Sequence, residues 1–126
     1  MYLEGRKTLK YDSKAKKVEM DGFVVDYIGL SLGYWRKHPD LHGFIVREFA
    51  DGVDDCREIY IGDEAGLSKI LVASEADGLP NTEGFFFGES MAEDKDNTRK
   101  ILEMAIAWVA EDDPRFYRGV YYRASW

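Results

Sequence analysis

The sequence has little of what would mark a secreted, metal-binding or membrane-spanning protein. Its single cysteine, Cys56, cannot form a disulfide within the chain or supply a cysteine-based zinc cluster, and two histidines are too few for a histidine-rich metal site. No apolar run approaches the roughly 18 residues that a membrane span needs, and the opening MYLEGRKTLK lacks the apolar segment of a signal peptide. We therefore expect a cytoplasmic protein with no metal, no cofactor and no membrane contact.

Positive charge is scarce over most of the chain. The 126 residues carry a formal net charge of −7, which argues against nucleic acid as the partner. Residues 1–17 are an exception, and we expect them to form a solvated hairpin rather than a phosphate-binding arm. Their charged residues are Glu4, Arg6, Lys7, Lys10, Asp12, Lys14, Lys16 and Lys17.

Hydrophobic patterning predicts a single α+β domain over residues 1–126. Segments rich in β-branched and aromatic residues predict strands over 2–10, 17–33, 57–62 and 116–126, with a turn over 12–16. Because strands and helices do not alternate regularly, we expect a mostly antiparallel sheet of about four strands with about three helices on one face. A split parallel arrangement is the alternative.

Three segments carry apolar residues at helical spacing. Pro39 suits the first position of a helix that Asp51-Gly52 would end, and Asp63 is a good N-cap for a second helix that Gly78 would end. A third helix is predicted from about Asp96 to a point before Pro114. The expected buried positions are Leu41, Phe44, Ile45, Phe49, Leu67, Ile70, Leu71, Ile101, Leu102, Ala105, Ile106, Trp108 and Val109.

A candidate catalytic group lies between residues 42 and 56. A histidine such as His42 can exchange protons near neutral pH, a carboxylate of Asp54 or Asp55 could orient it, and Cys56 would be the nucleophile if His42 took its proton. In such a hydrolase or transferase, Arg36 and Lys37 would hold an anionic substrate. We prefer the structural interpretation, in which His42 is packed and hydrogen-bonded, the carboxylates form a turn, and Cys56 is buried in the core.

Two aromatic segments are candidates for binding a partner. Tyr34-Trp35-Arg36-Lys37 lies at a strand-to-helix junction, where Trp35 could close the core and Arg36 pack over it. Tyr122 and the terminal Trp126 lie in the last strand, and a tryptophan at the end of a chain suggests attachment to the core or to another chain. A third aromatic segment, Phe85-Phe86-Phe87, is expected to be extended and buried on both sides.

Four segments occur together over the last three quarters of the chain. They are Tyr34-Trp35-Arg36-Lys37 with His42, Asp51-Gly52-Val53-Asp54-Asp55-Cys56, Leu79-Pro80 with Gly84-Phe85-Phe86-Phe87-Gly88, and Tyr122 with Ser125-Trp126. In this order they resemble a family of short proteins from phages and prophage-bearing bacteria. That family has no established activity, so the resemblance implies an origin and a shared fold rather than a mechanism.

Two functions from different classes follow from these observations. The first is a non-enzymatic module that binds a protein partner or a second copy of itself, as a possible homodimer. The second is the small hydrolase or transferase built on His42, Asp54, Asp55 and Cys56. A third possibility, nucleic-acid binding through residues 34–37 and the basic N-terminal segment, is opposed by the net charge.

Overall fold

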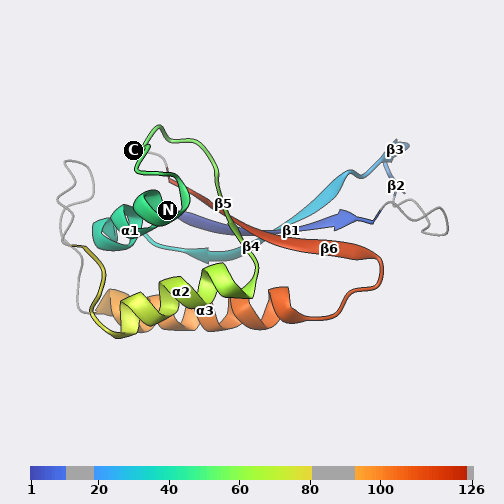
Figure 1. Cartoon of the computed structure of the whole chain (residues 1–126). Coiled ribbons are helices and arrows are strands. Elements are labelled where there is room, and N and C mark those ends of the chain that lie inside the picture. Colours follow the sequence, from blue (N-terminus) through green and yellow to red (C-terminus); the bar gives the residue numbers. More distant parts are fainter. Residues whose placement is uncertain (11–18, 81–92, 125–126) are drawn as a thin grey trace.

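The computed structural model describes residues 1–10, 19–80 and 93–124, and it has an α+β fold (Figure 1). The described strands are β1 (Tyr2–Leu9), β2 (Glu19–Met20), β3 (Phe23–Val24), β4 (Tyr27–Tyr34), β5 (Ile59–Gly62) and β6 (Phe116–Arg123). The described helices are α1 (Pro39–Phe49), α2 (Glu64–Glu75) and α3 (Glu93–Ala110). The expected fold class is therefore confirmed.

The main sheet has four strands in the order β4-β1-β6-β5, and all three neighbouring pairs are antiparallel. β1 and β6 pair along their whole length, with Tyr2 opposite Arg123 and Leu9 opposite Phe116, so the two ends of the chain meet in the middle of the sheet. β2 and β3 form a separate two-stranded hairpin. Because every described pair is antiparallel, the split parallel alternative is wrong.

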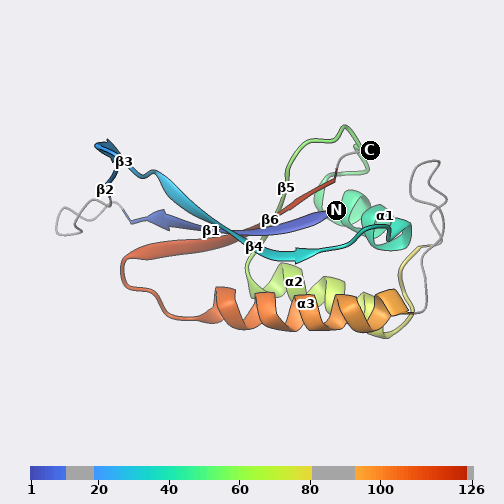
Figure 2. The ribbon, with the colours of Figure 1, turned by 180° about the vertical axis from the view of Figure 1, so that it is seen from behind.

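Helices α2 and α3 lie side by side against one face of this sheet, and α1 lies at one end of it (Figures 1 and 2). Two glycines on the strands allow α3 to approach the sheet closely. A Cβ atom on Gly5 of β1 would lie 2.7 Å from the Trp108 ring, and one on Gly33 of β4 would lie 2.3 Å from Ile101 Cγ2. Any larger residue at these positions would push α3 away from the sheet.

The core forms between this sheet face and the helices. Alternate residues of the central strands, Leu3, Val120 and Tyr122, are buried there. Trp35 is also buried, with 2% of its surface exposed, and its indole N–H donates to Thr98 Oγ1 of α3 at 3.0 Å. Trp35 therefore closes the core, as the sequence predicts, and cannot contact a partner. The buried helical residues that the sequence identifies are Leu41, Phe44, Ile45, Leu67, Ile70, Ile101, Leu102 and Ala105, while Phe49, Leu71, Ile106, Trp108 and Val109 are partly buried.

The local signals that begin and end helices are confirmed. Pro39 is the first residue of α1, and Asp63 caps α2 by accepting a hydrogen bond from the Ala65 N–H at 3.1 Å. Asp51 and Gly52 follow α1 with φ angles of 51° and 77°, a conformation that cannot continue a helix.

Other boundaries differ from expectation. The predicted strand over 17–33 is wrong, because Asp21 and Gly22 form a turn with φ angles of 53° and 83° between β2 and β3. Asp-Gly is a strong hairpin signal, since both central residues of such a turn need positive φ. The third helix begins at Glu93, three residues before Asp96. The predicted turn over 12–16 and the Phe85-Phe86-Phe87 segment lie outside the described residues.

Candidate functional site

His42, Asp54 and Tyr122 form a hydrogen-bonded cluster between α1, the loop that follows it, and β6. His42 is on the inner side of α1 with 5% of its surface exposed. Its Nδ1 atom lies 2.6 Å from the Tyr122 hydroxyl, and its Nε2 atom lies 3.1 Å from Asp54 Oδ2. Burial, with a smaller contribution from the Asp54 charge, raises the pKa of Tyr122 far above its usual value. The Tyr122 phenol therefore stays protonated, and its hydroxyl shares a hydrogen bond with His42 Nδ1, while the Asp54 carboxylate accepts from the other ring nitrogen, Nε2.

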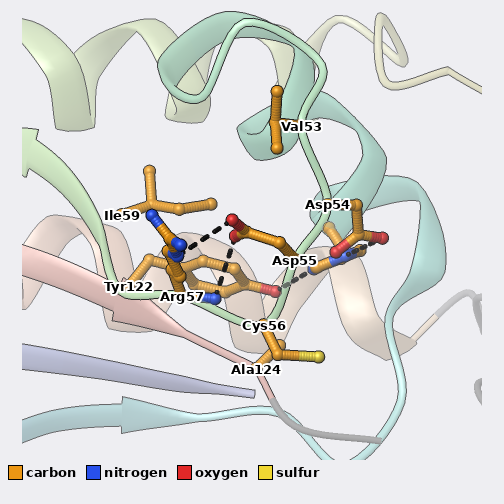
Figure 3. A pocket seen from close by; sticks show the side chains of 9 residues that line it. Val53, Asp54, Asp55, Cys56, Arg57, Ile59, Tyr122 and Ala124 are labelled. Carbon is orange, nitrogen blue, oxygen red and sulfur yellow. Dashed lines mark hydrogen bonds and ion pairs between the residues drawn. The ribbon is translucent and has the colours of Figure 1, made fainter.

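A small pocket adjoins this cluster (Figure 3). Its lining residues are His42, Val53, Asp54, Asp55, Cys56, Arg57, Ile59, Tyr122 and Ala124. Asp55 and Arg57 are bonded to each other within the loop. The Asp55 carboxylate accepts a hydrogen bond from the Arg57 backbone N–H at 3.2 Å and forms an ion pair with the Arg57 guanidinium at 3.1 Å. The free space measures about 10 Å³, which is close to the room that one water molecule requires.

The structure thus brings together all four candidate catalytic residues: His42, Asp54, Asp55 and Cys56. Cys56 is exposed in the loop, with a φ angle of 60°, so the expectation that it is buried is wrong. The loop carries too few apolar residues to fold over it. Both ring nitrogens of His42 are already bonded, so His42 could act as a base toward Cys56 only by breaking one of these bonds. Within the described part of the chain, no three His, Cys, Asp or Glu side chains are grouped to hold a metal ion.

The expected partner-binding residues divide into accessible and buried groups. Tyr34, Arg36 and Lys37 are exposed at the junction between β4 and α1. Trp35 and Tyr122 are buried, with 2% and 0% of their surfaces exposed, so the expectation that they bind a partner is wrong. Both point to the side of the sheet that the helices cover. Trp126 lies outside the described residues.

The opposite face of the sheet has no described helix on it (Figure 2). The strand register places six of the eight tyrosines of the chain there, and we call them the tyrosine face. They are Tyr2, Tyr27, Tyr34, Tyr60, Tyr117 and Tyr121. Five of them expose between 48% and 63% of their surfaces, and Tyr121, in the middle of the sheet, is half-buried.

Arg6 organises the centre of the tyrosine face. Its guanidinium lies over the Tyr121 ring at 4.1 Å and over the Tyr27 ring at 5.0 Å. It also pairs with Glu4 at 2.5 Å and with both carboxylate oxygens of Glu58, and these bonds raise its pKa further above its usual value. The side chains at the centre of the tyrosine face are therefore held in position before any partner binds.

Outward from this centre, the tyrosines pair with one another. The Tyr2 and Tyr34 rings lie 5.1 Å apart, and the Tyr60 and Tyr121 rings lie 5.0 Å apart. Sequence reasoning identified only Tyr34 of these six. Tyr117 and Tyr121 do show the even spacing of one strand face, but only the strand register shows that this face meets the tyrosines of β1, β4 and β5.

In the part of the chain that the structure covers, every helix is too short or too polar to cross a membrane. Comparison of the chain with family models, with curated proteins and with solved structures gives no match.

Proposed function

We propose that this chain is a non-enzymatic protein-binding module whose partner docks on the tyrosine face. The observation that carries the proposal is the position of six tyrosines on the sheet face that no described helix covers. Tyrosine combines a large apolar ring with a hydroxyl and has few rotatable bonds, so it binds at low cost in conformational entropy. A patch of this kind on a folded domain is typical of an interaction surface.

The chemistry of this face suits a protein better than a nucleic acid. Its central cation, Arg6, is already paired with Glu4 and Glu58 and so is not free to bind a phosphate. The chain as a whole carries a charge of −7, which opposes approach to a polyanion. A protein partner, in contrast, would bury tyrosine rings and an arginine together, which is the composition common at the centre of protein interfaces.

The cluster of His42, Asp54 and Cys56 supports the enzyme alternative less well. Its pocket has room for about one water molecule and not for an organic substrate. Arg36 and Lys37, proposed to hold an anionic substrate, are not among the residues that line it. The cluster instead fastens the loop after α1 to β6. A phage or prophage origin, on the sequence motifs, and a cytoplasmic location, on the lack of a long apolar run, belong to the same proposal.

Site-specific photocrosslinking in the cell of origin tests this proposal. A photoreactive phenylalanine at position 60 or 117 should give adducts with one discrete protein, because both tyrosines expose about 60% of their surfaces. The control positions Val72 on α2 and Met104 on α3 are slightly more exposed than these tyrosines and lie on helices at the opposite side of the sheet. They should give no such adduct.

The partner identified in this way is then purified for a binding measurement. Tyr60→Ser should weaken binding about tenfold or more, as expected for an interface tyrosine, whereas Val72→Ser and Cys56→Ser should leave it unchanged. The proposal fails if the adducts form from the helical positions, if nucleic acid is the crosslinked species, or if Cys56→Ser abolishes binding in a folded protein.

A further inference from the structure

Strand β4 forms one edge of the main sheet. Its residues Tyr27–Tyr34 pair with β1 on one side, and no described strand pairs with the other side. The opposite edge, β5, has only four residues and a register shift between Tyr60 and Gly62. A strand as long as β4 leaves a row of backbone N–H and C=O groups open to another chain.

β4 also lacks the features that usually block pairing at an edge. The segment from Tyr27 to Trp35 is the longest stretch of the chain without Asp, Glu, Lys or Arg, and it contains no proline. Its pairing with β1 is regular from Tyr27 to Ser31. On this stretch the apolar side chains of Ile28 and Leu30 remain 36% and 38% exposed. An uncharged edge adds no local charge repulsion when two copies of the strand lie side by side.

Among the described residues, the exposed side chains at the two ends of β4 carry opposite charges. Before β4 comes the β2–β3 hairpin, which lies at the end of the sheet farthest from α1 (Figures 1 and 2). The acidic residues Glu19, Asp21 and Asp26 are exposed there. After β4 come Arg36 and Lys37, exposed beside the start of α1. None of these five side chains forms an ion pair with another described residue.

We propose that β4 pairs antiparallel with β4 of a second copy, so that two sheets join into one continuous sheet of a symmetric homodimer. Full overlap of the strands places the two-fold axis near Leu30 and Ser31, and one of these residues then lies opposite itself. Antiparallel pairing brings the start of one β4 to the end of the other. The residue opposite Asp26 of one copy is then Arg36 of the other, or a residue at most two positions from Arg36. The two-fold axis makes this contact occur twice.

This pairing would bond or cover several groups that are exposed in a single copy. Backbone hydrogen bonds satisfy the open edge, and Leu30 of one copy is covered by Leu30 or Leu32 of the other, depending on which residue lies on the axis. The acidic hairpin of each copy meets the basic pair Arg36 and Lys37 of the other. Because the two-fold axis is perpendicular to the sheet, both tyrosine faces point to the same side and form one continuous surface. The inference does not depend on the function of that surface.

Sedimentation equilibrium of the purified full chain tests the inference. We expect twice the monomer mass, with a dissociation constant that rises as salt screens the contacts between charges. Leu30→Lys should give a monomer, because it places two like charges near the axis. The matched control Val72→Lys changes a more exposed residue on α2 and should leave the dimer intact.

A charge exchange tests the register separately from folding. Arg36→Glu alone and Asp26→Lys alone should each weaken the dimer about tenfold, since both contacts turn repulsive, and the two changes together should restore it. Circular dichroism checks that each variant is folded. A wild-type monomer at every concentration, a dimer that survives Leu30→Lys, or a double variant no stronger than the single ones would overturn the inference. The folded Leu30→Lys monomer retains its tyrosine face, so the proposed function can be tested on it independently.

Discussion

The hydrogen bond between Tyr122 and His42 offers the sharpest test of how α1, and through Asp54 the loop after it, is attached to the sheet. Tyr122→Phe removes only the hydroxyl and leaves the ring in its buried position. It also leaves His42 Nδ1 without the partner that lies at 2.6 Å. Loss of a hydrogen bond that leaves a buried polar atom unsatisfied costs about 1–3 kcal/mol. For a chain of this size, we expect the melting temperature to fall by about 4–12 °C.

Tyr121 provides a matched control one residue away. It points to the other face of the sheet, and its ring contacts Tyr60 and Arg6, which a phenylalanine would also do. Its hydroxyl has no hydrogen-bond partner among the described residues. Tyr121→Phe should therefore change the free energy of unfolding by no more than about 0.5 kcal/mol.

Urea unfolding followed by circular dichroism measures both variants. Asp54→Asn completes the series, because the Asp54 side chain is 42% exposed and its bond to His42 should contribute less than about 1 kcal/mol. The expected order of destabilisation is Tyr122→Phe, then Asp54→Asn, then Tyr121→Phe. If Tyr122→Phe were as stable as the wild type, the buried bond would not hold α1 to β6, and the structural role assigned to His42 would be wrong.

Three further predictions concern stability and accessibility. Gly66→Ala should destabilise the protein by more than about 1 kcal/mol in urea unfolding, because the alanine Cβ would lie 2.2 Å from the Ile61 carbonyl oxygen. Helix propensity alone would favour alanine at this position. The control Val72→Ala on the same helix should not destabilise the protein. The exposed thiol of Cys56 should react with Ellman's reagent as fast in the native protein as in urea, and a reaction that waits for unfolding would contradict its exposure. Burial lowers the pKa of His38 below 6.5, so the folded state binds fewer protons than the unfolded state and stability should fall as the pH drops from 7 to 5. His38→Gln should reduce this slope, and an unchanged slope would remove His38 as its cause.

Much of the fold follows from local patterns in the sequence. Pro39 and Asp63 begin helices because of backbone geometry and a side-chain hydrogen bond within a few residues. The hairpin at Asp21-Gly22 carries an equally local signal, but the apolar residues on both sides of it favour one long strand. Burial of Trp35 is predictable as well, since a large aromatic residue between a strand and a helix usually completes a core.

The positions of the candidate catalytic residues could not be predicted from local sequence patterns. His42 and Tyr122 are far apart in the sequence, and only the docking of α1 against the end of the sheet brings the imidazole within 2.6 Å of the hydroxyl. The exposure of Cys56 depends on how the loop after α1 crosses the molecule. The general tendency of free cysteines to be buried does not predict the path of this loop, and so it did not predict that Cys56 is exposed.

By itself, the sequence predicted the α+β class, a mostly antiparallel sheet, the starts of α1 and α2 and most of the buried apolar stripes. These depend on periodicity and on contacts between residues close together in the chain. The tyrosine face was decided only by the tertiary structure, because its six residues come from β1, β4, β5 and β6 and share a surface only through the strand register. A shift of one residue in that register would reverse the face of every side chain on a strand, and the register is fixed by packing of the opposite face against α2 and α3.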